Sequence, residues 1–500
     1  VVLPSIGNKK YVMFVDDLIR LKLNSIFSIF NSEEIEAYEL KITRDAELDI
    51  IDNISSSYLD RIHESIKMRR KGRAVRFTYE DSMPPDMLNF FLNKFRFKSS
   101  DVILPGGRYF NHKDFSKFPN LDLPEYQPLP NVPNKRLENC ASLFAEIAKK
   151  DIFLNFPYHT FDYFIDILRE ASIDPKVYSI KITLYRLGKY SSVINALINA
   201  LRNGKNVTVI VELQARFDEE ANIFWSKQLQ DEGAHVIYGV VGLKVHSKLC
   251  LITRKDHRSI EQYAVVSTGN FNEDTAKIYT DVMIITHDTR ITNDVDKVFE
   301  FLERNYKREN LSHLILSPFH FRSTIESLIN NEIENKKQGK EAWIKIKINN
   351  IVDPALIEKF YEASGVGVSI KMLVRGMISL WPQVEGLSEN IEARCIIDRF
   401  LEHSRIFVFC NGGDTKLFIS SADLMSRNLD RRVEITCPIY DADILKQLHE
   451  SFDILWSDNV KNRILDKEMT NSFVKVKGNG KLIRSQVELH SFFLRNIDKQ

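Results

Sequence analysis

Two short stretches of the sequence each place a histidine two residues before a cation. His246 and Lys248 lie in "GLKVHSKLCLI" (242–252), and His403 and Arg405 lie in "LEHSRIFVF". Side chains two residues apart in a strand lie on the same face, so each pair presents an imidazole beside a positive charge. An imidazole can attack phosphorus or carry a proton, and a fixed cation offsets charge on phosphoryl oxygens. The two pairs therefore predict phosphoryl-transfer chemistry.

Each histidine pair is followed by an apolar run and then by a short polar turn, "STGN" in the first case and "SSAD" in the second. We expect the small hydroxyl groups of these turns to donate to oxyanions. Asn270 and Asp423, which end the turns, are interpreted mainly as turn-capping residues. A single histidine of this kind is usually a structural residue, but the repeated arrangement favours a functional one.

The elements that must position these residues also occur twice. Apolar runs such as "VYSIKITLYR" (177–186) alternate with amphipathic segments, and a second series begins near residue 342 with "AWIKIKINN". This alternation predicts α/β domains with largely buried sheets, and the repetition predicts two similar domains in tandem that bring both histidines to one cleft. Lys181 and Lys347, inside the first strands of the two series, are matched to each other and interpreted as phosphate contacts, because a buried unpaired ammonium is costly.

The composition restricts the class of protein. The chain has 500 residues, of which 44% are hydrophobic and 27% charged, and 69 basic against 68 acidic residues give a net charge of +1. This balance argues against a nucleic-acid-coating protein and requires any polyanion to bind a local cluster of cations. The five cysteines show no C-x-x-C spacing, which predicts buried, reduced thiols and a cytoplasmic location. No apolar run approaches the ~20 residues that span a bilayer, and peripheral membrane association stays open.

A proline-rich segment suggests the main domain boundary. "LDLPEYQPLPNVPN" contains four prolines in fourteen residues, a density that resists both helix and sheet. We therefore predict an N-terminal domain over residues 1–120, a linker over 121–137, and two catalytic domains over 138–315 and 316–500.

The H-x-K arrangement resembles the phospholipase D superfamily, although Thr253 stands where that superfamily usually has an aspartate. Longer stretches resemble one branch of it, the polyphosphate kinases, which are ATP:polyphosphate phosphotransferases. These stretches include "IKITLYRLGKYSSVINALINALRNG", "STGNFNEDTAKIYTD", "DRFLEHSRIF" and "FISSADLMSRNLDRRVE". The resemblance implies two tandem phospholipase D-like α/β domains after a helix-rich α+β domain. "TRDAELD" (43–49) resembles a dimer-forming region of that family, which implies a homo-oligomer.

The resemblance also implies roles for individual residues. His246 matches the histidine that becomes phosphorylated, and His403 matches a second essential histidine that touches nucleotide phosphate and assists proton transfer. Tyr279 in "KIYTD" and Arg375 in "LVRG" match ATP-contacting positions. Lys248 completes the catalytic set together with Arg405.

Two further arginines, Arg186 in "TLYR" and Arg216 in "QARFDEE", match positions of the family's magnesium site. A guanidinium is always cationic and cannot ligate a metal, so we interpret both as bidentate phosphate clamps. Mg²⁺ would then be held by phosphate oxygens and water, as its hydrated character favours.

The function implied by the resemblance is reversible transfer of the terminal phosphate of ATP, through a phosphohistidine, to inorganic polyphosphate. Its partners would be ATP, ADP and polyphosphate, with no nucleic acid. Two alternatives stay open from the residues alone: a phosphodiesterase that uses water as acceptor, and a non-enzymatic polyanion-binding scaffold. The chain begins "VVLPSIG", and no segment matches the opening motif of the family's N-terminal helical domain, so we expect the N-terminal region and the adenine-binding wall to be incomplete.

Overall fold

The computed structural model describes most of the chain as two compact units, Val1–Gln127 and Pro128–Gln500. The described residues are 1–30, 34–44, 72–111, 115, 118–123, 125–138, 140–188, 190–213, 219–240, 242–256, 259–304, 310–475 and 480–497. The division between the units falls inside the proline-rich segment. Pro130 and Val132 of that segment already belong to the second unit, because Val132 is fully buried and His490 hydrogen-bonds to the carbonyl of Pro130.

The first unit has α+β structure in its described part. A three-stranded sheet has the order β3-β4-β5, with β3 antiparallel and β5 parallel to β4, and β1 and β2 form a separate hairpin. Buried Phe77 on β4 packs edge-on against Phe97, with ring centroids 5.5 Å apart. Most of the "TRDAELD" segment lies outside the described residues. The elements are β1 (Val2–Ile6), β2 (Lys9–Val12), α1 (Val15–Leu21), α2 (Leu23–Ile26), η1 (Ser28–Phe30), β3 (Leu40–Arg44), β4 (Ala74–Glu80), α4 (Pro85–Lys94) and β5 (Val102–Gly106).

The second unit begins with a domain whose central strands are apolar and buried, as the sequence predicts. Helices start where side chains cap them: Ser191 accepts a hydrogen bond from the backbone N–H of Ile194 at the start of α7, and Asp288 caps α10 in the same way. The elements are α5 (Leu143–Lys149), β6 (Ile152–Phe156), α6 (Asp162–Ile173), β7 (Val177–Leu184), α7 (Ser192–Arg202), β8 (Asn206–Val211), α8 (Glu219–Asp231), β9 (His235–Tyr238), β10 (Lys244–Val245), β11 (Leu249–Asp256), β12 (Ser259–Ser267), α9 (Glu273–Ala276), β13 (Tyr279–Thr286) and α10 (Thr289–Glu303).

A second domain of the same kind follows. Asp353 caps α12, and Pro354 occupies its first turn, where the missing N–H costs nothing. The elements are β14 (Ile315–Ser317), α11 (Phe321–Lys337), β15 (Trp343–Ile348), α12 (Pro354–Gly365), β16 (Ser369–Val374), β17 (Ile391–Ile396), β18 (Leu401–Glu402), β19 (Arg405–Phe409), η3 (Asn411–Gly413), β20 (Lys416–Ser420), α13 (Ser426–Arg431), β21 (Arg432–Pro438), α14 (Ala442–Trp456), β22 (Asn462–Leu465) and α15 (Ser485–Arg495).

The two domains share one sheet topology apart from the additional edge strand β22 of the second, and each contributes a short strand to the sheet of the other. The first sheet runs β18-β13-β12-β11-β7-β8-β9, with β6 beside β13. The second runs β10-β21-β20-β19-β15-β16-β17-β22, with β14 beside β21. β10, which leads to His246, pairs with β21 of the second domain, and β18, which leads to His403, pairs with β13 of the first. This exchange brings both histidines to the junction of the two sheets.

One apolar core joins the two domains. It contains Val295 and Phe299 of α10, Leu448 and Phe452 of α14, and Phe493 of α15, all nearly or fully buried. At about 25 cal/mol per Å² of apolar surface, a core shared in this way strongly favours the docked arrangement. The predicted fold class, tandem α/β domains after an N-terminal α+β domain, is confirmed. Within the described residues, no helix has the length and apolar character needed to cross a membrane.

Candidate active site

His246 of the first domain is held by a carboxylate of the second. Its Nδ1 lies 2.8 Å from Oε2 of Glu434, a side chain with no solvent exposure, and its backbone N–H donates to the carbonyl of Val433 at 2.9 Å. Both contacts follow from the pairing of β10 with β21. A carboxylate at Nδ1 fixes the orientation of the ring and directs Nε2 to the other side. Nε2 of His246 has no hydrogen-bond partner among the described residues.

His403 is held in the equivalent way by a carboxylate of the first domain. Its Nδ1 lies 2.8 Å from Oδ2 of Asp281, and its backbone N–H donates to Oγ1 of Thr280 at 3.2 Å. The backbone of Gly269 passes against this carboxylate, because a Cβ at that position would come within 2.2 Å of Oδ2 of Asp281. Glycine is therefore required at this point for steric reasons. Unlike His246, His403 has a second contact, because its Nε2 lies 3.3 Å from Nη1 of Arg405.

The small hydroxyl groups of the two turns serve the carboxylates. Oγ1 of Thr268 donates to Asp281 at 2.6 Å, and Oγ of Ser421 donates to Glu434 at 2.6 Å. The expectation that these hydroxyls donate to substrate oxyanions is therefore wrong, because a buried carboxylate close by is the stronger acceptor. Ser267 and Ser420 likewise bond within the sheets. Ser267 donates to a backbone carbonyl, and Ser420 shares a hydrogen bond with a threonine hydroxyl.

The two predicted cations lie beside their histidines but are balanced differently. Nζ of Lys248 donates to the carbonyl of His246 and lies 5.2 Å from the centroid of the Tyr185 ring. Burial lowers the pKa of Lys248 to about 7. Nη1 of Arg405 donates to the carbonyl of His403 at 3.0 Å, and its Nε donates to Asp423 at 3.2 Å. Asp423 therefore does more than cap a turn, because it neutralises the second cation.

Burial disfavours the charged form of both imidazoles. Burial, followed by the charge of Lys248, holds the pKa of His246 well below its usual range. Burial also lowers the pKa of His403, although Asp281 opposes that shift. Burial disfavours the charge on Asp281, but the contact with His403 outweighs it and lowers the pKa of Asp281. A neutral imidazole that donates from Nδ1 has a free electron pair on Nε2, which is the form needed for attack on phosphorus.

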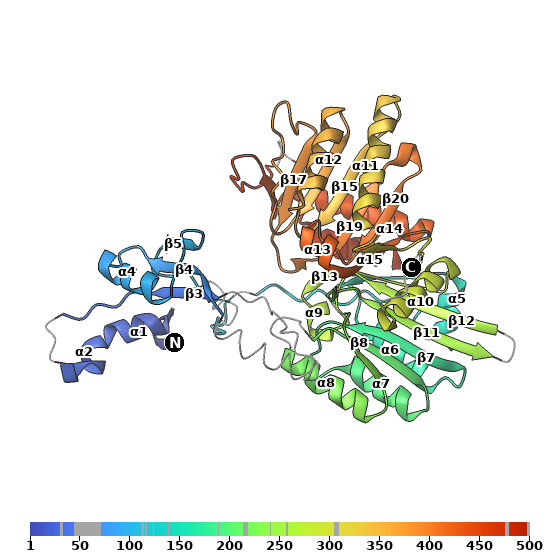
Figure 1. Cartoon of the computed structure of the whole chain (residues 1–500), viewed down its shortest axis with the longest axis horizontal. Helices are drawn as coiled ribbons and strands as arrows, with labels where there is room; N and C mark the ends of the chain where they lie inside the picture. The colour runs from blue at the N-terminus through green and yellow to red at the C-terminus, as the bar shows by residue number, and fades with distance from the viewer. Residues whose placement is uncertain are drawn as a thin grey trace. The chain divides into compact units, whose positions relative to one another are not determined.

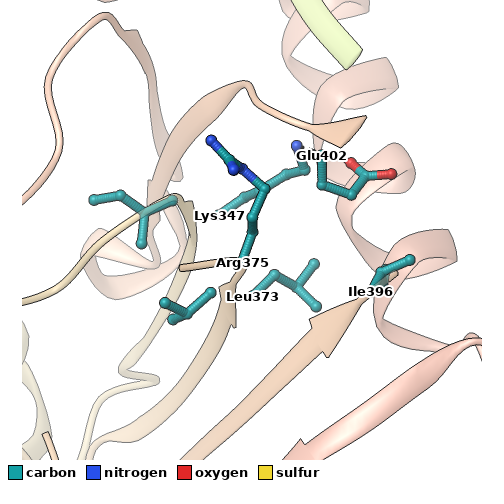
Figure 2. A pocket seen from close by; sticks show the side chains of 7 residues that line it. Lys347, Leu373, Arg375, Ile396 and Glu402 are labelled. Carbon is teal, nitrogen blue, oxygen red and sulfur yellow. Dashed lines mark ion pairs between the residues drawn. The ribbon is translucent and has the colours of Figure 1, made fainter. Parts of the chain in front are cut away.

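The two predicted ATP-contacting residues lie next to His403. The Tyr279 ring centroid is 5.0 Å from that of His403. Arg375 follows β16, its Nε donates to Oδ1 of Asn349 at 2.9 Å, and its side chain lines a pocket (Figure 2). Burial and the charge of Arg405 lower the pKa of Arg375. The pocket also contains Lys347 and Glu402, and its apolar lining residues are Ile348, Leu373, Val374 and Ile396.

Comparisons with known proteins agree with this arrangement. The family model of the polyphosphate kinase middle domain matches residues 1–118, and those of the C-terminal domains 1 and 2 match residues 142–308 and 314–486. The chain belongs to the polyphosphate kinase family. The polyphosphate kinase of Vibrio parahaemolyticus is 47% identical over 98% of this chain and 71% of that protein, and that of Escherichia coli K12 is 42% identical over 97% and 71%. The crystal structure of the Porphyromonas gingivalis enzyme is similar with a TM-score of 0.83 and 33% identity, covering 100% of this chain and 74% of that chain.

Of the two arginines matched to the magnesium site of polyphosphate kinases, one lies within the described residues and the other does not. Arg186 directly follows Tyr185, whose ring lies edge-on to His246 at 4.7 Å, so it is on the His246 side of the site. Arg216 lies outside the described residues. No group of three or more histidine, cysteine or acidic side chains in the described part of the chain could hold a metal ion. The nearby carboxylates already bind a histidine or an arginine, so the described residues offer no metal-ligand set.

The matching of Lys181 with Lys347 is wrong by two residues. Lys181 lies opposite Leu251 in the sheet, and its structural counterpart Lys345 lies opposite Val408. Both ammonium groups contact the helix that packs on their sheet: Lys181 pairs with Asp296 and Glu303 of α10, each at 3.2 Å, and Lys345 pairs with an aspartate of α14. The predicted phosphate contact of Lys181 is therefore wrong.

Lys347 lies nearer the site, but its ammonium group already contacts other side chains of the protein. Its Nζ is 3.0 Å from Glu402 and donates to Oγ of Ser404 at 2.7 Å. The predicted phosphate contact of Lys347 is therefore not supported either.

Sequence reasoning missed the two carboxylates that orient the histidines. Asp281 and Glu434 lie in "YTDV" and "RVEI", at equivalent places on β13 and β21. Each stands fourteen residues after the first serine of its turn, Ser267 or Ser420. That common spacing was available as a signal. The crossed pairing was not, because it depends on the exchange of β10 and β18 between the domains.

Proposed function

We propose that this chain is a polyphosphate kinase that moves the terminal phosphoryl group of ATP to inorganic polyphosphate through a phosphohistidine at His246. The observation that carries the proposal is the state of that ring. Nδ1 of His246 is held by buried Glu434, whereas Nε2 has no partner among the described residues and lies in surroundings made positive by Lys248. An oriented, neutral imidazole beside a cation is suited to attack a phosphate.

In the first half of the reaction, the electron pair on Nε2 of His246 forms the N–P bond. The bond between the terminal phosphorus and its bridging oxygen breaks, and ADP leaves with that oxygen. The proton on Nδ1 stays between the ring and Glu434, so the carboxylate balances the positive charge that develops on the imidazole. In the second half, an oxygen at the end of the polyphosphate chain attacks phosphorus, the N–P bond breaks, and His246 is regenerated.

His403 acts on the nucleotide in this proposal. With Tyr279 and Arg375 beside it, and once its Nε2 has taken up a proton, it contacts the phosphates of ATP and assists proton transfer to the departing oxygen. Its hydrogen bond to Asp281 orients the ring. General acid–base assistance of this kind typically raises the rate by ~10²–10⁴-fold. Lys248, Arg405, Arg186 and Arg216 hold phosphoryl oxygens. Mg²⁺ enters as part of the MgATP substrate, bound through phosphate oxygens and water.

The test is to incubate the protein with γ-labelled ATP and magnesium, and to examine the protein-bound label. We expect label that acid removes and base does not, which is typical of phosphohistidine, together with labelled polyphosphate. His246→Ala should lose both products. His235→Ala, which changes an exposed histidine on β9, is the matched control and should keep both.

Polymer synthesis by purified His246→Ala would refute the nucleophile assignment. Release of inorganic phosphate from ATP without bound label or polymer would instead favour water as the acceptor. A homo-oligomeric state and a cytoplasmic location belong to the proposal as well, and neither affects the outcome of this experiment.

A further inference from the structure

The segment that carries His403 contains a buried ion pair that has no counterpart at His246. The residue before His246 is Val245, whereas the residue before His403 is Glu402. In the first domain, the Thr183 hydroxyl donates to the carbonyl of Ser247. The sheet register puts Lys347 at the position that corresponds to Thr183. A neutral hydrogen bond in one domain is thus replaced by a charged pair in the other.

This ion pair is connected to the backbone of His403. Oε2 of Glu402 lies 3.0 Å from Nζ of Lys347 and also accepts a hydrogen bond from Oγ1 of Thr280 at 2.8 Å. The Thr280 oxygen in turn accepts the backbone N–H of His403 at 3.2 Å. Figure 2 shows the side chains of Lys347 and Glu402 beside that of Arg375. Because burying two charges costs more than a well-packed apolar pair, such a pair suggests a demand for a defined geometry.

The C-terminal helix holds the other end of Glu402. Nε2 of Gln486, on α15, donates to Oε1 of Glu402 at 2.7 Å and to the carbonyl of Phe400 at 2.9 Å. Oε1 of Gln486 accepts the backbone N–H of Phe400 at 2.9 Å. Gln486 has no solvent exposure, so all these bonds form away from competing water. Just before the helix, Arg484 pairs with Asp398, which fixes the start of the same segment.

We propose that Gln486, Glu402 and Lys347 are positioning residues through which the C-terminal helix sets the orientation of His403. They touch no substrate and act through Thr280 and the backbone of His403. The effect on catalysis rests on the function proposed above, whereas the effect on the ring of His403 does not. A displacement of about 1 Å in a catalytic group can cost ~10²-fold in rate, so loosening one link should cost roughly tenfold.

The test uses Gln486→Met, which keeps the length of the side chain and removes its hydrogen bonds. Gln447→Met is the matched control, because Gln447 is also a buried amide, on α14, and its Oε1 has no partner among the described residues. Glu402→Gln is a second variant in case the first does not fold. Histidine-selective ¹⁵N NMR reports the ring of His403, assigned by loss of its signals in His403→Ala, and steady-state kinetics report kcat and KM separately.

We expect Gln486→Met and Glu402→Gln to shift or broaden the ring signals of His403, to leave those of His246 in place, and to lower kcat roughly tenfold with little change in KM for polyphosphate. Gln447→Met should change none of these. Unchanged His403 signals in a folded Gln486→Met or Glu402→Gln variant would overturn the proposal, as would an equal effect of Gln447→Met. If the unmodified protein makes no polyphosphate, the proposed function fails, while the NMR comparison still decides the positioning role.

Discussion

The two histidine sites have the same plan but different electrostatics. In both, a carboxylate from the opposite domain binds Nδ1, and a cation two residues later donates to the carbonyl of the histidine. In the second site, Asp423 neutralises Arg405. At the equivalent place in the first site stands Asn270, which is uncharged and whose Oδ1 has no partner in the described part of the chain.

This difference indicates why the two rings can have different tasks. Burial, followed by the charge of Lys248, holds the pKa of His246 well below the usual range. Without an acid at this place, the surroundings of His246 stay positive and favour the arrival of a negatively charged phosphoryl group. Nε2 of His403 is already close to Arg405, so this ring is better suited to hold a phosphate than to attack it. The presence of a carboxylate at one site and not at the other is therefore consistent with the proposed roles of nucleophile for His246 and assistant for His403.

The comparison is tested most severely by His403→Ala. We expect polymer synthesis to fall by ~10²–10⁴-fold, because a proton donor and a phosphate contact are lost, while His246 still becomes labelled slowly. His246→Ala, in contrast, should show no label at any time. The measurement is single-turnover labelling from γ-labelled ATP in both variants. Labelling of His403→Ala at the unmodified rate would show that His403 has only a structural role.

The crossed carboxylates give the next largest effect. Asp281→Asn and Glu434→Gln keep the shapes of the side chains but remove the charges that orient the rings, and we expect losses of about 10²-fold in kcat. Asp294→Asn is the matched control, because that equally buried carboxylate accepts backbone N–H groups of residues 312–314, and its change should lower only the melting temperature. Equal rates in the three variants below their melting temperatures would disprove the orienting role.

We expect the ionisation of Lys248 to determine how kcat/KM for ATP depends on pH. Because its pKa is about 7, the side chain is an ammonium below that pH and loses its charge as the pH rises through 7. We expect kcat/KM for ATP to decline above pH 7 in the unmodified protein. Arginine keeps its charge, so Lys248→Arg should hold its own, lower rate to higher pH. The ionisation of ATP is common to both proteins, so parallel profiles would contradict this interpretation.

Much of the fold was predictable from the sequence, because the alternation of apolar runs and amphipathic segments reports local structure. The repeated histidine–cation pairs likewise identified the central residues of the site. What could not be predicted is the exchange of β10 and β18, because each is only two residues long and its pairing depends on how the domains dock. Asp281 and Glu434 were missed for that reason.

The error over Lys181 has a different origin. A strand side chain reports its face by alternation, but two positions on one face differ by about 7 Å along the strand. Lys345 and Lys347 share a face of β15, and sequence comparison alone cannot decide which of them matches Lys181. Only the register against β11 and β19 does so.

The smallest effect is therefore expected at Lys181, although its sequence context resembles that of Lys347. Lys181→Met removes two partly exposed ion pairs with α10, which should lower the free energy of unfolding by about 1 kcal/mol and change kcat by less than twofold. Burial opposes the charge of Lys181, but Asp296 and Glu303 outweigh it and raise the pKa, so the contribution is fully present at pH 7 and is lost only as the pH rises through that raised value.

Lys347→Met, in contrast, leaves Glu402 buried without its cation, directly before His403. It should lower kcat roughly tenfold even at temperatures where the protein stays folded. Denaturant unfolding and steady-state rates, measured on both variants under the same conditions, separate the two cases. A tenfold loss of kcat in Lys181→Met would mean that Lys181 contacts phosphate once substrate binds, and that Lys181 and Lys347 have equivalent functions.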